Sequence, residues 1–249
     1  MPPSDSEPLH LDILAVGAHP DDVELGCGGT LAMAVDSGKA VGIVHLTRGE
    51  RGTRGTPAER EAEARAAGAA LGAAAVEILD CTDGALRTSE VEEDALIALL
   101  RRYRPEIVLS PAPEDRHPDH GRAHRLVKDA CFYDGLRRRA PRTGEPHRPG
   151  AVFSYMQHDA FEPSFVVDVG AAWDRKVAAL ACYASQLYRP NDSRDEPATK
   201  VASREFSRAV EGRARHFGQM INAELGEPFW SRTPLAVGDL SHLVPGGLR

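Results

Sequence analysis

Residues 13–31 constrain the fold most strongly, because an apolar run, a polar cluster and a glycine-rich segment follow one another there. The run Ile13–Val16 is too short for a helix and predicts a buried strand. The polar residues that follow are His19, Asp21 and Asp22. A helix is expected around Leu31–Val35. Ligands bind at strand ends in open α/β sheets, and a helix cap would need only one of these side chains. The cluster is therefore a candidate metal or catalytic site.

Strand and helix patterns alternate along the chain. Further strands are expected at Val41–Leu46, Val76–Leu79, Ile107–Leu109, Val152–Tyr155 and Phe165–Val169. Helices are expected at Ala58–Leu71, Ser89–Leu100, Trp173–Tyr183 and Phe206–Leu225. Strands separated by helices of this length form βαβ units. The sequence therefore predicts an α/β fold with a mostly parallel sheet flanked by helices.

The chain of 249 residues contains no linker-like tract. We therefore expect residues 10–249 to form one domain, preceded by a disordered leader at residues 1–9.

A second polar cluster follows the strand at Ile107–Leu109. It contains His117 and His120, and Pro118 between them suits the first turn of a helix. The carboxyl ends of parallel strands meet at one edge of a sheet, so we expect the two clusters to converge.

The clusters supply a two-histidine, one-carboxylate set: His19, Asp22 and His120. Catalytic zinc uses such ligands, and so does non-haem Fe²⁺. Asp21 is next to Asp22 and would activate a water whose pKa the metal lowers. His117 could polarise a carbonyl or protonate a leaving group. His124 is expected beside the site or at the surface, and His158 is of interest because it follows a strand.

Two other function classes each account for part of the sequence. The glycines of Gly26–Gly29 lie between a strand and a helix, as in a nucleotide-binding protein. However, the acidic side chains before them would repel a pyrophosphate. A non-enzymatic metal-binding or sugar-binding module is a third interpretation, but it does not explain Asp21 and His117, which a set of ligands alone does not need.

Charge and composition limit the partners. The net charge of −7 and the pI near 5.8 argue against nucleic acid and anionic membranes. No apolar run reaches the ~20 residues of a membrane span, and the N-terminus lacks the apolar core of a signal peptide. A cytoplasmic protein with a small-molecule substrate is expected. The four cysteines are too far apart for a Cys-x-x-Cys zinc site.

The paired motifs His19-Pro-Asp-Asp22 and His117-Pro-Asp-His120 resemble those of the LmbE-like / PIG-L family of zinc-dependent N-acetylglucosaminide deacetylases, and the similarity covers most of the chain. Four further segments resemble the branch of this family that makes bacillithiol: Leu46–Thr56, Ser185–Asn191, Glu196–Thr199 and Arg213–Trp230.

The resemblance implies a Rossmann-like (LmbE-like) fold and the release of acetate from an N-acetylglucosaminyl conjugate. N-acetylglucosaminyl L-malate is the first expectation; an inositol glycoside, a thiol conjugate or a chitooligosaccharide are alternatives. By position, the metal ligands are His19, Asp22 and His120, and the general base is Asp21. His117 would stabilise the oxyanion or act as acid, and Asp119 would orient it. Arg60 and Arg116 would contact substrate. A homo-oligomer, as a hexamer, is also implied by the resemblance alone.

Overall fold

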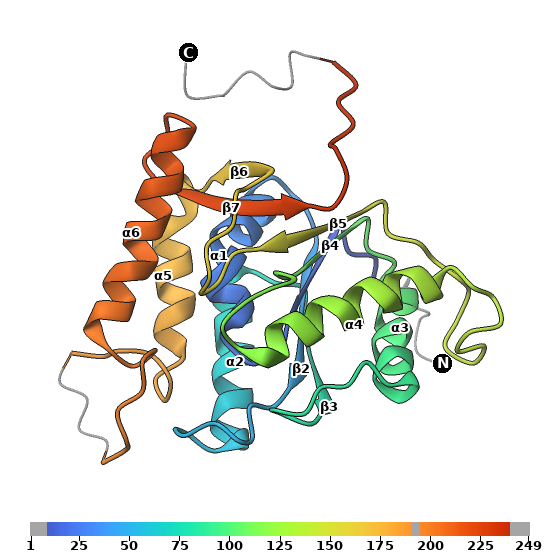
Figure 1. Cartoon of the computed structure of the whole chain (residues 1–249), viewed down its shortest axis with the longest axis horizontal. Helices are drawn as coiled ribbons and strands as arrows, with labels where there is room; N and C mark the ends of the chain where they lie inside the picture. The colour runs from blue at the N-terminus through green and yellow to red at the C-terminus, as the bar shows by residue number, and fades with distance from the viewer. Residues whose placement is uncertain (1–8, 191–194, 240–249) are drawn as a thin grey trace, which may run out of the picture.

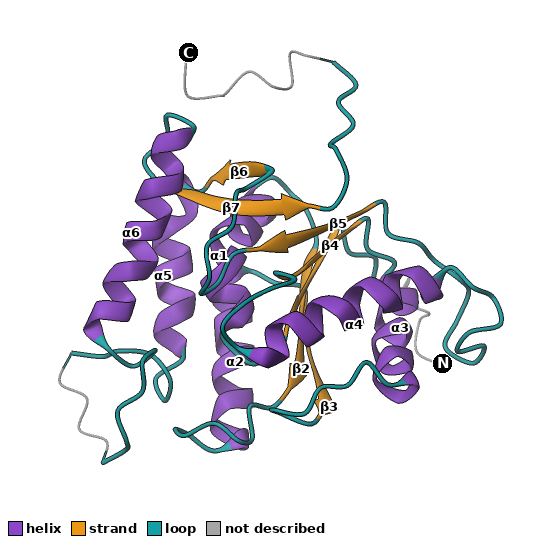
Figure 2. Cartoon of the chain, in the orientation of Figure 1, coloured by secondary structure: helices purple, strands orange, loops and turns teal. Residues whose placement is uncertain are grey.

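The computed structural model describes residues 9–190 and 195–239. The expected leader, except for Leu9, lies outside these residues. A single seven-stranded sheet with helices on both faces makes up the described part of the chain (Figure 1 and Figure 2). This confirms the expected α/β class. Within residues 9–190 and 195–239, no helix combines the length and the apolar character needed to cross a membrane.

The strands are β1 Ile13–Gly17, β2 Val41–Thr47, β3 Ala75–Cys81, β4 Ile107–Pro111, β5 Ala151–Tyr155, β6 Phe165–Asp168 and β7 Gly226–Ser231. The helices are α1 Asp22–Asp36, α2 Pro57–Leu71, α3 Glu90–Tyr103, α4 Pro118–Asp134, α5 Trp173–Cys182 and α6 Arg204–Met220, and a short 3₁₀ turn spans Gly170–Ala172. A capping box is present at the start of α3, with Ser89 and Glu92 bonding reciprocally.

The strand order is β3-β2-β1-β4-β5-β7-β6. The first five strands in this order are parallel, and β7 runs antiparallel between β5 and β6. The chain order reverses between β1 and β4, which are direct neighbours. In doubly wound sheets this switch point is where ligands bind, at the carboxyl ends of the strands.

The core has two main layers because side chains alternate along each strand. Leu14 and Val16 of β1 point to the face covered by α3 and α4. Ala15 points to the opposite face, with α1, α2 and α5. Figure 1 shows the two groups of helices on either side of the sheet. Helix α6 packs against β6 and β7.

Helix α1 begins at Asp22 and not near Leu31, so the expected boundary is wrong. Glycine is a poor helix former, which is why the sequence suggested a loop. These glycines serve packing instead. A Cβ on Gly26 would lie 2.1 Å from the ring of Tyr155, so only glycine allows this approach of helix and sheet.

A kink divides α1 at Cys27, where φ is −143°. Kinks leave backbone groups without helical partners. The Lys176 ammonium of α5 donates to the Leu25 carbonyl at 2.9 Å. The Glu227 carboxylate of β7 accepts from the Gly29 amide at 2.9 Å. Lys176 and Glu227 also form a buried ion pair with each other. Two distant elements thus complete the hydrogen bonding of one helix.

The nucleotide-binding interpretation of Gly26–Gly29 is wrong. A phosphate-binding loop needs backbone amides that face a ligand. In the structure these residues are buried inside α1, and the Gly29 amide is bonded to Glu227.

Near residue 225, one expected helix boundary is wrong and one strand was not predicted. Helix α6 ends at Met220 and not at Leu225, and the strand β7 was not expected. The chain turns at Asn222, which adopts a positive φ of 59°. Pro228 within β7 masks the strand in the sequence, because proline usually argues against an inner strand.

Candidate active site

Both polar clusters lie at the same edge of the sheet, as expected. His19 follows β1 and the pair His117 and His120 follows β4, the adjacent parallel strand. The ring centroids of His19 and His117 are 4.7 Å apart, and those of His117 and His120 are 5.0 Å apart. Each imidazole offers a nitrogen within 4.8 Å of the other two. The three rings therefore converge on one point.

Asp22 connects two of these histidines. Its Oδ1 lies 3.3 Å from His120 Nε2, and its Oδ2 lies 3.4 Å from His19 Nδ1. The carboxylate is buried. Burial alone would raise the pKa of Asp22, but the two histidines hold this pKa well below its usual value. Asp22 is thus ionised, as a metal ligand must be.

This group of side chains fits a divalent cation. Ligands at the 2.0–2.2 Å bond lengths of tetrahedral zinc stand about 3.3 Å from one another, and each Asp22 oxygen lies at about this distance from a different histidine, 3.4 Å from His19 Nδ1 and 3.3 Å from His120 Nε2. In the described part of the chain, the buried His19 Nε2 makes no hydrogen bond, although Asp83 Oδ1 is 3.1 Å away. His19, Asp22 and His120 therefore remain the predicted ligands, for zinc or for Fe²⁺.

Asp21 stands beside this group in a strained backbone conformation. Its φ of 98° is in a region that side chains other than glycine rarely adopt, at a cost of about 1–3 kcal/mol. Burial raises the pKa of its carboxyl to about 7, and the neighbouring Asp22 adds to this, while Arg60 acts in the opposite direction. A carboxylate with a pKa near neutrality is well suited to act as a general base.

The Arg60 side chain bonds to the loop that carries Asp21. It is 4% exposed, and its two terminal nitrogens donate to the carbonyls of Gly49 at 2.9 Å and Pro20 at 3.0 Å. These two bonds use two of the five N–H donors of the guanidinium, and a direct contact of Arg60 with substrate stays a prediction. Arg116 is exposed next to His117, where a ligand could reach it; its role also stays a prediction.

His117 caps α4, and this contact indicates its tautomer. Its Nδ1 accepts a hydrogen bond from the Asp119 backbone amide at 3.3 Å. An imidazole that accepts at Nδ1 carries its proton on Nε2 when neutral. Burial lowers the pKa of His117, and the neighbouring His19 and His120 lower it further. The ring is thus a neutral Nε2–H donor at neutral pH.

The Asp119 carboxylate does not make the expected contact with His117 among the described hydrogen bonds. It accepts from the Gly84 amide at 2.6 Å and from Arg122 at 3.0 Å. Its Oδ2 also lies 3.5 Å from His19 Nε2. The fully buried carboxylate thus faces His19, and the sequence could not reveal this because Gly84 and His19 follow strands other than the one before Asp119.

Sequence reasoning missed three polar groups that surround the predicted ligands. Asp115 Oδ1 lies 3.0 Å from His120 Nδ1, and Asp115 Oδ2 accepts from the His158 amide at 2.9 Å. Gln157 donates to Asp22 Oδ1. Asp83 approaches His19 from the end of β3. Metal-binding histidines commonly hold their orientation through such a carboxylate. The sequence pointed to two of these residues only through their position: Asp83 follows β3 and Gln157 follows β5, so both lie at the same edge of the sheet.

His158 and His124 have distinct places. The His158 ring stacks on His120 with centroids 5.6 Å apart, and it contacts Phe206 of α6 in a tilted arrangement at 5.7 Å. His124 lies further along α4, with its Nδ1 3.1 Å from the Pro111 carbonyl oxygen. His124 is thus a packing residue away from the cluster.

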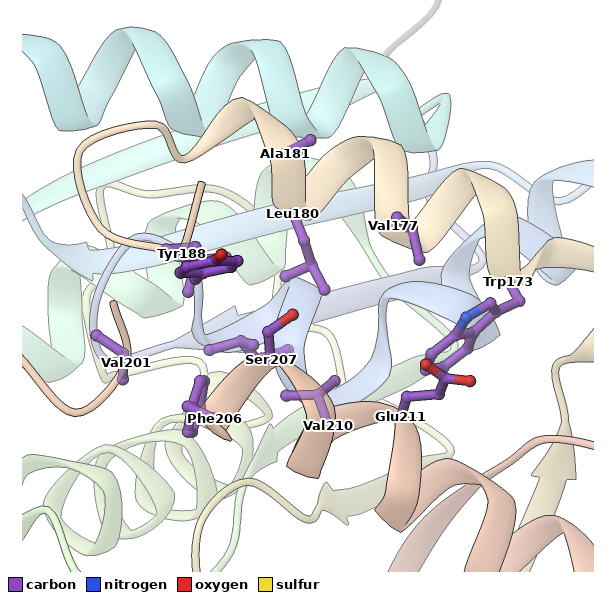
Figure 3. Close-up of a pocket in the computed structure, with 12 residues that line it drawn as sticks. Trp173, Val177, Leu180, Ala181, Tyr188, Val201, Phe206, Ser207, Val210 and Glu211 are labelled. Atoms are coloured by element: carbon purple, nitrogen blue, oxygen red, sulfur yellow. The ribbon is translucent and has the colours of Figure 1, made fainter. Parts of the chain in front are cut away.

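A separate apolar cavity of about 250 Å³ lies between α5 and α6. Figure 3 shows side chains of both helices converging on it, among them Leu180, Phe206 and Val210. None of its lining residues belongs to the histidine cluster. The candidate chemistry is therefore located at the strand ends and not in this cavity.

Comparisons with known proteins show which family the chain belongs to. The family model described as PIG-L, GlcNAc-PI de-N-acetylase, matches residues 14–131, which include both motifs. The chain is 31% identical to a diacetylchitobiose deacetylase of Thermococcus kodakarensis, over 70% of each chain. It is also 31% identical to a 4-oxalmesaconate hydratase of Pseudomonas putida, over 70% of this chain and 73% of the relative. The crystal structure of a conserved protein from Thermus thermophilus is 40% identical, with a TM-score of 0.82, and the match covers 91% of this chain and 97% of that one.

Proposed function

Because the chain belongs to the PIG-L (GlcNAc-PI de-N-acetylase) family, we propose that it hydrolyses the N-acetyl amide of an N-acetylglucosamine conjugate. The products are acetate and a free glucosamine amine. The observation that carries this proposal is the convergence of three histidines beside the buried carboxylates of Asp21 and Asp22. A base of this kind next to a cation site is suited to the activation of water.

In this proposal His19, Asp22 and His120 hold a divalent cation, which supplies Lewis acidity at the acetyl group. Asp21 accepts the proton of the attacking water. The Nε2–H of His117 donates a hydrogen bond to the oxyanion that develops on the acetyl carbonyl. The proton needed by the leaving amine comes from Asp21 or from His117.

For the substrate we propose N-acetylglucosaminyl L-malate, and the support is twofold. Segments such as Leu46–Thr56 resemble the bacillithiol branch, and the exposed Arg116 can bind a carboxylate. An inositol glycoside, a thiol conjugate or a chitooligosaccharide would use the same site. The hexamer implied by the resemblance is a further proposal.

The test is metal analysis of the purified protein, followed by amine release from N-acetylglucosaminyl malate and from N-acetylglucosamine. We expect about one zinc or iron per chain and release that a chelator abolishes. The proposal fails if the metal-loaded protein releases no amine from any N-acetylglucosamine conjugate, or if it hydrates 4-oxalmesaconate instead.

Replacing Asp21 tests the assigned base directly. We expect Asp21→Asn to lower kcat by about 10²–10⁴-fold because the base is lost. The metal content should remain that of the wild type, as measured by elemental analysis. Loss of the metal together with activity would show that Asp21 and Asp22 have exchanged roles.

A further inference from the structure

A polar groove of about 470 Å³ lies beside the candidate site, between the loop after β3 and the first turns of α4. Its walls are formed by the segment from Gly84 to Thr88 and by Arg122 and Arg125 of α4. The groove is distinct from the apolar cavity between α5 and α6, which shares none of these residues.

The groove is strongly basic. Three of its lining residues are arginines, and none is acidic. Within the described residues, the Arg87 guanidinium has no hydrogen-bond or ion-pair partner. The Arg125 side chain is 72% exposed, and its one ion pair, with Asp129, is long at 3.7 Å. Of the three guanidinium groups, only that of Arg87 lacks a partner among the described residues, and in a chain with a net charge of −7 the three arginines are a local concentration of positive charge.

The groove is connected directly to the histidine cluster. Arg122 uses one terminal nitrogen to donate to Asp119 Oδ1, and its side chain remains 47% exposed. The Gly84 amide donates to the other oxygen of the same carboxylate. Asp119 in turn lies 3.5 Å from His19 Nε2. The wall of the groove and the histidine cluster are therefore joined through the buried carboxylate of Asp119.

We propose that the groove binds an anionic group of the substrate's aglycone, a carboxylate or a phosphate, and that Arg87, Arg122 and Arg125 select for it. This rests on the proposed deacetylase function. Guanidinium groups bind both anions through paired hydrogen bonds, and several arginines around one groove discriminate against neutral ligands. Arg87 and Arg125 are the residues that decide specificity, because Arg122 is already engaged by Asp119.

The test compares three conjugates of N-acetylglucosamine: the malate glycoside, the 1-phosphate and the neutral methyl glycoside. For Arg87→Ala and Arg125→Ala we expect the ratio of kcat/KM for an anionic conjugate to that for the neutral one to fall about fivefold to tenfold each. The malate and phosphate arms show which anion the groove takes. Arg138→Ala, which removes the same charge at an exposed position beyond α4, is the control and should leave the ratio unchanged. An unchanged ratio in both groove variants would overturn the proposal.

A binding measurement separates this proposal from the deacetylase function. Free L-malate and inorganic phosphate are titrated calorimetrically into the metal-loaded wild type and into the Arg87→Ala/Arg125→Ala double variant. Weaker binding of at least one anion by the double variant, by about tenfold or more, supports the groove even if no conjugate is deacetylated. Equal binding of both anions by the two proteins contradicts the groove even if deacetylation is observed.

Discussion

The two polar motifs at the sheet edge are held in place in different ways. The motif after β4 is supported from nearby in the sequence: Pro118 begins α4, His117 caps it, and Asp115 holds His120. The motif after β1 leads into a kinked helix whose freed backbone groups are bonded by Lys176 and Glu227. One half of the site is therefore specified locally, and the other half depends on tertiary structure.

The largest effect on stability should follow from replacing Glu227, which bonds to α1 from a distant part of the chain. We expect Glu227→Ala to lower the free energy of unfolding by about 3–5 kcal/mol, because it leaves the buried Lys176 charge unpaired and the Gly29 amide unbonded. Urea unfolding followed by circular dichroism measures this. The control is Glu224→Ala, which removes an exposed ion pair with Arg215 and should cost less than about 1 kcal/mol. Equal losses of unfolding free energy in Glu227→Ala and Glu224→Ala would contradict a special stabilising role of the contacts between Glu227 and α1.

A smaller effect is expected at the locally supported motif. Asp115→Asn should weaken metal binding about 10–100-fold, because the carboxylate that orients His120 loses its charge. The free energy of unfolding should change little. Competition with a chromophoric chelator gives the affinity, and Asp159→Asn, at an exposed neighbouring position, is the matched control. A stability loss as large as that of Glu227→Ala would remove the contrast between the motifs.

The smallest effect is expected on the pH dependence of stability, through His124 of α4 and its contact with the Pro111 carbonyl. Burial lowers the pKa of His124, so the folded protein keeps this ring neutral at a pH where the unfolded chain protonates it. Its contribution to stability is present above the unfolded pKa of about 6.5 and is lost as the pH falls toward the folded value. We expect His124→Gln to reduce the loss of stability between pH 7 and pH 5.5, by less than about 1 kcal/mol. Thermal unfolding across this range measures it, and the exposed His10→Gln should keep the wild-type slope. An unchanged slope in His124→Gln would contradict this role.

The sequence was most informative where structure is local. Short apolar runs identified the parallel strands, and the polar residues after β1 and β4 had to meet because parallel strands present their ends together. The contacts of Asp119 and Gln157 were not predictable, since they depend on which elements become neighbours in the sheet. Arg60 shows the same limit: its bonds to the carbonyls of Gly49 and Pro20 were not predictable, because both partners come from other segments of the chain.

The bond between the Gly29 amide and Glu227 also has a consequence for the order of events during synthesis. These residues are 198 positions apart. At about 5–20 residues per second, a ribosome needs roughly 10–40 s to make that length of chain. Throughout this interval the nascent chain carries Asp22 at the start of a helix that lacks its support from β7. We therefore expect the proposed metal site to bind stably only after β7 has entered the sheet.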